Sequence, residues 1–328
     1  MLRSVLNMFT GRPTLCVFDL TTRCNSRCSM CSIWKRREKE MTFDEIDRVF
    51  SDLRRFGIHT IFLQGGEPLV RKDVYEVIKT LDKKGFRTVV LTNGILLNEK
   101  ALERLDNLNS SGRISVTVSL DTLDRKKYLK IRGVDKLDTV MKNIKLLSGY
   151  PGLRGGVHAT ITSINYMELE DIHNLVSKLG LEFTFNTYND IKNYASSSDR
   201  NLHLGRKMDA AIKEMEKLKK KMPLIYRPFI DDNIRYLRGE NIGQCDAFEN
   251  SFRVTSEGML SPCLEFPPVY DLKKHDINRN WKEWKDKMQC AIRRCYTRTP
   301  CFYGCTRGTG SVKKRPTFAF LGMMHTIK

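Results

Sequence analysis

The sequence has 328 residues, with 57 Lys and Arg against 38 Asp and Glu, ten cysteines and 41% hydrophobic residues. A chain of this length and composition can bury a core, and we expect one large domain and a smaller one. Its apolar residues lie in periodic segments, which excludes intrinsic disorder, and no apolar run is long enough to span a membrane. Residues 1–13 do not have the pattern of a secretory signal, so we expect a cytoplasmic protein.

The formal net charge of +19 is compatible with nucleic acid, an anionic membrane surface, an acidic substrate or a Lys/Arg-rich proteome. Residues 271–315 contain 13 Lys and Arg against four acidic residues, but these lie among cysteines and no nucleic-acid-binding module accompanies them. This argues against a nucleic-acid partner. An amphipathic N-terminal stripe is better explained by packing on the barrel, and a membrane-surface foot or lid is the second interpretation, so peripheral membrane contact stays open. The stripe consists of Leu2, Val5, Leu6 and Phe9.

Short β-rich runs alternate with amphipathic helical segments through the first half of the chain. We expect strands at 14–20, 59–64, 88–91, 114–120, 157–162 and 182–186, and helices at 42–56, 72–84, 98–108, 136–147 and 169–179. Thr42 and Glu45 have the spacing of a capping box. This alternation is typical of a parallel sheet, and six units are too few for a closed eight-stranded barrel. We therefore predict an α/β fold, a partial (β/α)6 TIM barrel, in residues 1–195.

The alternation stops after this segment. A polar, turn-rich stretch and a Lys/Glu-rich helix over 204–222 indicate a helical connector at 196–240. From there the chain is rich in cysteine and weakly periodic. We expect residues 241–328 to form a small domain that is ordered by metal rather than by a hydrophobic core.

Three cysteines, Cys24, Cys28 and Cys31, directly follow the first predicted strand. Ligands of α/β folds bind at this end of the strands. Three thiolates on one loop can hold three irons of a [4Fe–4S] cluster and leave the fourth iron open. The alternative is a zinc site with a distant fourth ligand. Cys16 stands apart inside the strand, where we expect a buried small residue.

Short motifs at the ends of the next three strands resemble those of the radical S-adenosylmethionine (SAM) superfamily. The segment CNSRCSMC resembles that family's CxxxCxxC motif, and Gly65-Gly66-Glu67-Pro68 is identical to its GGEP motif. Further matches are LTNG at 91–94 and SLD at 119–121, and the resemblance covers about residues 14–187. It implies a SAM-binding [4Fe–4S] cluster on the triplet, one-electron cleavage of SAM, and a 5′-deoxyadenosyl radical that abstracts a substrate hydrogen.

The resemblance also implies which residues contact SAM. Gly65 and Gly66 would let the amino group of SAM approach the backbone, Glu67 would supply an acceptor, and Arg132 would bind the carboxylate. Met30, where the family more often has an aromatic residue, would cover the cluster and the adenine. The full expected set is Met30, Gly65, Gly66, Glu67, Pro68, Thr92, Asn93, Ser119, Asp121 and Arg132.

The distal cysteines are similar to the SPASM extension of radical SAM enzymes, which holds auxiliary clusters. By that resemblance, Cys245, Cys263 and Cys305 would serve one auxiliary [4Fe–4S] cluster, and Cys290, Cys295 and Cys301 a second. Each is then one thiolate short. Two departures from the SPASM pattern stand out: the usual final cysteine is absent, and a C-x2-C pair is stretched to C-x4-C. The missing ligand is an oxygen or nitrogen group, a substrate atom, or nothing if only one auxiliary cluster forms. Gly258, between these cysteines, predicts a hairpin turn.

We therefore expect an enzyme that modifies a peptide or oxidises a small biosynthetic intermediate, reduced by a donor such as ferredoxin or flavodoxin. A lipid or membrane-associated substrate is the first alternative, and a non-catalytic iron–sulfur scaffold or electron carrier is the second. An electron carrier does not need the SAM-contact motifs, which argues against the second alternative. His158 would either face the barrel interior toward substrate or serve as a structural histidine. No motif in the sequence identifies the substrate, the catalytic acid or base, or the oligomeric state.

Overall fold

The computed structural model describes residues 12–189, 199–298 and 301–302. The N-terminal stripe and Cys305 lie outside these residues. The strands are β1 (Leu15–Thr21), β2 (Thr60–Gly65), β3 (Arg87–Thr92), β4 (Ile114–Ser119), β5 (Gly156–Ile161), β6 (Glu182–Thr187), β7 (Ser251–Val254), β8 (Met259–Ser261) and β9 (Tyr270–Asp271). The helices are α2 (Phe43–Phe56), α3 (Val74–Lys83), α4 (Glu99–Leu108), α5 (Arg125–Arg132), α6 (Leu137–Leu147), α7 (Leu169–Lys178), α8 (Met208–Lys221), α9 (Arg227–Leu237) and α10 (Ile277–Arg298).

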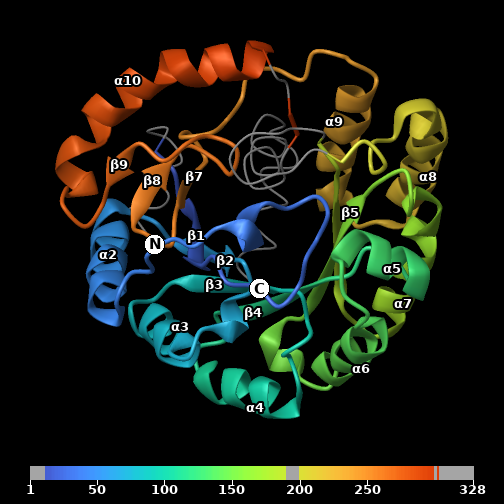
Figure 1. Ribbon diagram of the computed structural model, residues 1–328, viewed down its shortest axis with the longest axis horizontal. Helices are drawn as coiled ribbons and strands as arrows, with labels where there is room; N and C mark the ends of the chain where they lie inside the picture. Colours follow the sequence, from blue (N-terminus) through green and yellow to red (C-terminus); the bar gives the residue numbers. More distant parts are fainter. Residues whose placement is uncertain (1–11, 190–198, 299–300, 303–328) are drawn as a thin grey trace.

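The strands form one sheet in the order β6-β5-β4-β3-β2-β1-β7-β8-β9, and β1 to β6 pair in parallel with their neighbours in sequence. The helices surround the curved sheet on its outer side (Figure 1). This is the predicted α/β fold, a partial TIM barrel with a C-terminal extension. The carboxyl ends of six parallel strands therefore meet at one edge, which is where the cysteine triplet begins.

Side chains alternate between the two faces of the sheet. On β1, Phe18 packs on Phe50 of α2 with ring centroids 4.8 Å apart, so the even-numbered residues face the helices. The odd-numbered Asp19 lies on the opposite face, which we call the inner face. On β5, the outward Val157 and Ala159 are fully buried, and His158 between them is only partly buried on the inner face. The core thus lies between sheet and helices, and polar residues line the inside.

The helix α2 begins where the sequence predicts. The Thr42 side chain accepts a hydrogen bond from the Glu45 backbone N–H at 3.3 Å, and the Glu45 carboxylate accepts one from the Thr42 N–H at 2.8 Å. This is the predicted capping box. At the other end, Gly57 has a φ of 108°, a left-handed conformation that ends the helix.

The C-terminal region differs from the prediction of a domain ordered by metal. Strand β7 pairs in parallel with β1 and continues the barrel sheet. The helix α10, which weak periodicity did not predict, buries Trp281 and Trp284 in the same core cluster as the barrel. Trp281 contacts Phe56 of α2 with ring centroids 5.0 Å apart. A shared hydrophobic core therefore holds this region to the barrel.

Gly258 forms the predicted hairpin turn. It has a φ of 81° between β7 and β8, and its N–H donates to the Thr255 carbonyl at 2.9 Å.

Like α10, the helices α5 and α9 were not predicted from the sequence. No helix within the described ranges is long and apolar enough to cross a membrane.

Candidate functional site

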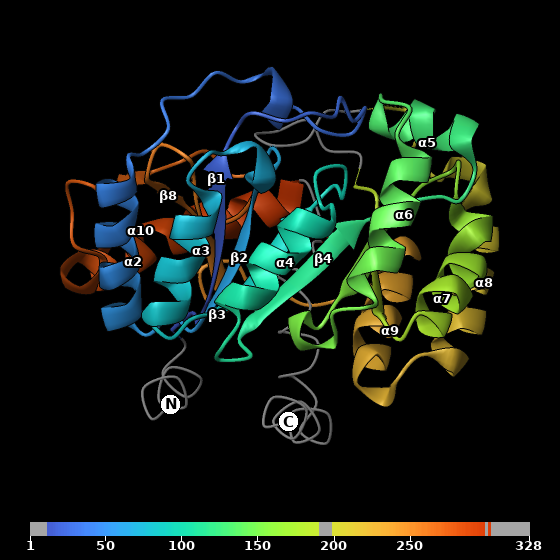
Figure 2. The ribbon, with the colours of Figure 1, turned by 90° about the horizontal axis from the view of Figure 1, so that it is seen from below.

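The loop that carries the three cysteines follows β1 and crosses above the strand ends toward α5 (Figure 2). Cys24, Cys28 and Cys31 are each partly exposed. Burial raises the pKa of Cys24 to about 11, and the neighbouring Cys28 contributes to the shift. Burial also raises the pKa of Cys31 to about 11, and Cys28 and Cys24 both contribute. The three thiols therefore lie within electrostatic reach of one another in a partly enclosed site.

Three thiols on one loop are a donor set that a [4Fe–4S] cluster takes, with one thiolate for each of three irons. Among the described residues, no group of three or more His, Cys, Asp or Glu side chains is arranged to hold one metal ion. Each thiolate of a [4Fe–4S] cluster binds a different iron, so the thiolates lie farther apart than the ligands of one ion. Binding to iron also removes the thiol protons and the repulsion among the thiolates.

Helix α5 is docked directly on this loop. The backbone N–H of Arg27 donates to the Arg132 carbonyl at 3.0 Å, and that of Ser29 donates to the Ile131 carbonyl at 3.0 Å. A Cβ at Gly133 would lie 2.4 Å from the Arg27 carbonyl oxygen. A glycine at this position therefore allows the two backbones to touch.

Arg132 joins the cysteine loop to the end of β4. Its Nε lies 2.6 Å from Oδ2 of Asp121, which is fully buried, and its Nη1 lies 3.9 Å from Sγ of Cys28. Burial alone would lower the pKa of Arg132, but the negative charges of Asp121 and Cys28 outweigh it and hold the pKa above its usual range. A fixed positive charge thus lies beside the triplet, as the expected role toward a SAM carboxylate requires.

Glu67 is completely buried, and its carboxylate is hydrogen-bonded to neighbouring residues of the protein. Its carboxylate accepts hydrogen bonds from the Asn93 N–H at 2.7 Å, the Thr92 hydroxyl at 2.8 Å and the Leu69 N–H at 3.1 Å. Burial raises its pKa to about 7 despite these donors. We therefore interpret Glu67 as the residue that holds the loops after β2 and β3 together, where the sequence suggested a direct acceptor for SAM.

The glycines of the GGEP motif also allow two backbone segments to pack closely against each other. A Cβ at Gly65 would lie 2.3 Å from the Thr21 carbonyl oxygen, and one at Gly66 would lie 2.2 Å from that of Arg23. The Gly66 N–H donates to the Thr21 carbonyl at 2.7 Å. The motif is thus pressed against the chain that leads into the cysteine loop. The neighbouring Pro68 is buried at the start of a short 3-10 helix.

Asn93 connects the loop after β3 to the cysteine loop. Its Nδ2 donates to Oδ1 of Asn25 at 2.6 Å and to the Ser26 hydroxyl at 3.2 Å, and it lies 3.9 Å from Sγ of Cys24. Ser119, the last residue of β4, is partly exposed at the same edge. The structure thus brings the predicted motif residues to one end of the sheet.

Met30 is partly buried and packs against a small apolar cluster. It contacts the group formed by Ile131, Tyr188 and Leu202, which comes from α5 and from the chain after β6. Met30 therefore connects the cysteine loop to α5 and to the chain after β6. This position is compatible with the predicted cover over the cluster and the adenine.

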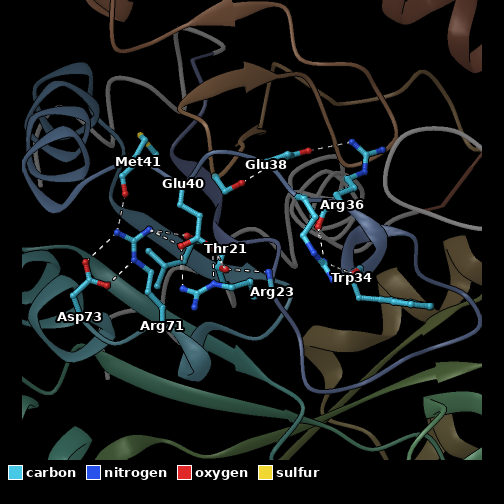
Figure 3. A network of polar contacts seen from close by, with 12 residues as sticks. Thr21, Arg23, Trp34, Arg36, Glu38, Glu40, Met41, Arg71 and Asp73 are labelled. Carbon is cyan, nitrogen blue, oxygen red and sulfur yellow. Dashed lines mark hydrogen bonds and ion pairs between the residues drawn. The ribbon is translucent and has the colours of Figure 1, made fainter.

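A buried arginine, which the sequence did not single out, clamps the return of the cysteine loop (Figure 3). The Arg71 guanidinium donates to the Leu20 carbonyl at 3.1 Å, the Met41 carbonyl at 2.8 Å and the Asp73 carboxylate at 2.6 Å. Glu40 lies 3.7 Å away and also pairs with Arg23. Arg71 therefore fixes both ends of the loop that carries the thiols.

His158 faces the inner side of the barrel, one of the two positions considered from sequence. Its Nδ1 lies 3.0 Å from the Thr184 hydroxyl, and its Nε2 lies 3.2 Å from Nδ2 of Asn186. Burial lowers its pKa to about 4, so the ring is neutral near pH 7. Its strand neighbour on β4 is Ser119. A neutral histidine with protein partners at both ring nitrogens therefore lies on the inner face, as a structural histidine would, and a role toward substrate stays a prediction.

The distal cysteines do not all lie on one surface. Cys245 and Cys263 are partly buried and pack against the main core. Cys290 is exposed, whereas Cys295, on the same helix, is partly buried. Cys301 is partly buried and precedes Phe302, which exchanges backbone hydrogen bonds with the Asn189 side chain at 2.9 and 3.0 Å. The assignment of Cys290 and Cys295 to one ligand set stays a prediction. Cys16 is fully buried, as expected.

Comparison with known proteins agrees with this geometry. The radical SAM superfamily matches residues 18–179. The protein named "Probable GTP 3′,8-cyclase" in Methanococcus vannielii is 31% identical over 261 residues, which cover 75% of this chain and 83% of that protein. The GTP 3′,8-cyclase of Clostridium perfringens is 29% identical over 285 residues, which cover 80% of this chain and 83% of that protein.

Two solved structures share the fold. Streptococcus suis SuiB bound to S-adenosylmethionine superposes with a TM-score of 0.64 at 16% identity, over 85% of this chain and 67% of that one. Native anSMEcpe with bound AdoMet and the Cp18Cys peptide gives a TM-score of 0.62 at 18% identity, over 96% of this chain and all of that one. At such identities the similarity concerns the fold alone, so the peptide in the second structure does not indicate the substrate here.

Proposed function

Because the chain belongs to the radical SAM superfamily, and is therefore an enzyme that uses SAM and a [4Fe–4S] cluster, we propose that it abstracts a hydrogen atom from a small biosynthetic intermediate. The observation that carries this proposal is the convergence of the thiol triplet, Asn93 and Arg132 at one end of the barrel. The small-molecule substrate is supported by the sequence relatives, which are named as GTP 3′,8-cyclases and match over most of their length.

Cys24, Cys28 and Cys31 would hold the SAM-binding cluster. When bound, this cluster and SAM supply one electron and the 5′-deoxyadenosyl radical. Arg132 would bind the SAM carboxylate while Asp121 fixes its guanidinium. The Glu67 hydrogen bonds keep the loops after β2 and β3 in place, so that the backbone beside the cluster is already ordered before SAM arrives.

The inner face would receive the substrate. His158 is neutral and hydrogen-bonded to Thr184 and Asn186, so we expect it to position a neutral polar group rather than to transfer a proton. The reaction would require the inner face to keep water and oxygen away from the radical. The reductant would be an acidic protein such as ferredoxin or flavodoxin, for which the net charge of +19 is favourable, in a reducing compartment such as the cytoplasm.

We also propose an auxiliary iron–sulfur cluster at the other end of β1. Cys263 follows β8, whose last residue, Ser261, lies opposite Arg253 of β7. Ser251 is level with Leu15, the first residue of β1, and Cys245 approaches the same place through the bridge between Ala247 and Ser251. The seven residues of β1 separate the two sites by about 20 Å.

Deuterium transfer tests the class of substrate. Metabolites from the source organism, grown in perdeuterated medium, are separated by size into a small-molecule fraction and a peptide and protein fraction. Each is incubated anaerobically with reconstituted enzyme, SAM and reductant. We expect deuterated 5′-deoxyadenosine from the small-molecule fraction and none from enzyme in which Cys24, Cys28 and Cys31 are changed to Ala. Deuterium that comes only from the peptide and protein fraction would show that the proposed substrate class is wrong.

A further inference from the structure

Exposed cations are concentrated on the cysteine loop and on the segment that follows it. Residues 23–40 contain six Lys and Arg against two Glu and no Asp. Both glutamates are paired within this segment (Figure 3): Glu40 lies 3.0 Å from Arg23, and Glu38 lies 3.3 Å from Arg36. The other four cations are exposed and form no ion pair with a carboxylate in the part of the chain that the structure describes. They are Arg27, Lys35, Arg37 and Lys39.

The partly exposed Trp34 lies among these cations. Cζ of Arg27 lies 5.1 Å from the centre of the Trp34 ring, and Nζ of Lys35 lies 5.2 Å from it. Nη1 of Arg37 donates to the Trp34 carbonyl at 3.1 Å. Attraction between a cation and the face of an aromatic ring holds two of these positive charges beside the indole. An aromatic side chain and several unpaired cations thus form one surface.

This surface is connected directly to the thiol triplet. Nε1 of Trp34 donates to the Cys28 carbonyl at 3.2 Å. Nη1 of Arg27 donates to the Cys24 carbonyl at 2.8 Å. The expected SAM contacts approach the sulfur atoms of the same two cysteines from the strand ends. The loop therefore has the SAM contacts on its side toward the strands and exposed cations around Trp34 on its side toward solvent.

The place of these cations indicates the kind of anionic partner. They are exposed on a loop that crosses above the strand ends (Figure 2), whereas a small substrate would lie on the inner face. A protein that reduces the cluster must bring its own redox centre close to the triplet. Because SAM would take the side toward the strands, we expect the electron to arrive from the solvent side. Opposite charge orients such a partner and speeds its association, and Trp and Arg are enriched at protein interfaces.

We propose that the surface formed by Arg27, Trp34, Lys35, Arg37 and Lys39 is the docking site of an acidic one-electron carrier protein. This inference rests on the proposed function, in which the triplet holds the SAM-binding cluster, and it adds the place where the reductant binds. The reduced carrier loses one electron and is oxidised, and the [4Fe–4S] cluster gains that electron and is reduced. No covalent bond forms or breaks in this step.

Charge reversal at two of the lysines tests this surface. The double variant Lys35→Glu with Lys39→Glu makes the surface less positive and keeps the hydrogen bonds that Trp34 and Arg27 donate to the cysteine loop. The matched control is Lys213→Glu with Lys220→Glu, which changes the net charge equally at two exposed positions of α8.

The probe is a recombinant flavodoxin with a net negative charge. Isothermal titration calorimetry gives its Kd for each anaerobically reconstituted protein, and stopped-flow absorbance gives the rate at which reduced flavodoxin reduces the cluster. SAM cleavage with dithionite is measured in parallel, because this small reductant does not need a docking site. A single-stranded RNA is titrated in the same way to test a nucleic acid as the partner.

We expect Lys35→Glu with Lys39→Glu to weaken flavodoxin binding about tenfold or more at an ionic strength of about 0.01 M, and to slow cluster reduction by flavodoxin. The difference should shrink at about 0.15 M, where the Debye length is about 8 Å. The control variant should stay within about twofold of the wild type, because its charges lie outside the contact. SAM cleavage with dithionite should be the same in all three proteins.

Equal Kd values and reduction rates in the two double variants would overturn the docking site. An RNA that binds the wild type more tightly than flavodoxin does, and binds Lys35→Glu with Lys39→Glu weakly, would also overturn it by assigning the surface to a nucleic acid. A wild type that does not cleave SAM with dithionite would instead contradict the proposed function, so the two failures can be told apart.

Discussion

Arg253 of β7 and Asp19 of β1 form a buried ion pair between residues 234 positions apart in the chain. Nε of Arg253 lies 2.6 Å from Oδ2 of Asp19, and the two side chains are 1% and 3% exposed. Gln64 of β2 donates to the other Asp19 oxygen at 3.1 Å. The pair lies on the inner face, and Asp19 precedes Cys24 by five residues. It therefore fixes the C-terminal hairpin against the strand that leads into the cysteine loop.

Removing only one member of this ion pair should destabilise the folded protein. Arg253→Met leaves the Asp19 charge buried without its cation, and we expect the free energy of unfolding at pH 7 to fall by about 3–5 kcal/mol. The double variant Asp19→Asn with Arg253→Met removes both charges and should lose less. Urea unfolding of the wild type, both single variants and the double variant measures this. A double variant that is less stable than Arg253→Met would contradict the explanation by an unpaired charge.

The Arg71 clamp gives a second prediction. Lysine cannot reach the Leu20 and Met41 carbonyls and the Asp73 carboxylate at once, so Arg71→Lys should destabilise the protein by about 2–3 kcal/mol. It should also lower the iron retained by the triplet after desalting. Arg23→Lys is the matched control, because Arg23 is 51% exposed and its pair with Glu40 should contribute less than about 1 kcal/mol. Equal effects of the two changes would argue against the clamp.

Gly66 should not tolerate even a methyl group. The added Cβ of Gly66→Ala would lie 2.2 Å from a backbone oxygen, so the loop must move away from the chain entering the cysteine loop. We expect weakened SAM binding, measured by equilibrium dialysis of the reconstituted protein. Gly112→Ala is the control, since a Cβ there meets nothing within 4 Å, although the positive φ of 67° adds local strain. Unchanged SAM affinity in Gly66→Ala would refute the packing role of this glycine.

The Glu67 carboxyl predicts a pH dependence of stability. Its pKa of about 7 in the folded protein exceeds the ordinary value of 4.5 because the group is buried. The folded state therefore holds its proton where the unfolded state has lost it, and stability should fall as pH rises from about 4.5 to 7 and then level off. Relative to Glu67→Gln, which cannot titrate, the loss should total about 3 kcal/mol. Urea unfolding of both proteins from pH 4.5 to 8 measures this difference. The same pH dependence of the free energy of unfolding in the wild type and in Glu67→Gln would contradict the prediction.

Much of the barrel could be predicted because its signals are local. Alternating apolar runs identified all six barrel strands, and Thr42 and Glu45 marked the start of α2. Helix α5 was missed because its eight residues contain five basic side chains and little apolar periodicity. Its position depends on backbone contacts with Arg27 and Ser29, which no local pattern reveals.

The site was predictable in composition but not in its internal connections. The motifs indicated which residues meet at the strand ends, but not that Glu67 would bind Asn93 and Thr92, since those contacts depend on the register of the sheet. The pairing of β7 with β1 was likewise hidden, because it joins segments more than 200 residues apart.

The central claim is that Cys24, Cys28 and Cys31 hold the cluster that cleaves SAM. The most direct measurement is the amount of 5′-deoxyadenosine that anaerobically reconstituted protein forms from SAM and a reductant, compared with the variant in which all three are changed to Ala. Cys290→Ala controls for the loss of a thiol that is exposed in the structure. We predict 5′-deoxyadenosine from the wild type and from Cys290→Ala, and none above background from the triple variant. Equal amounts from the triple variant and the wild type would contradict the account.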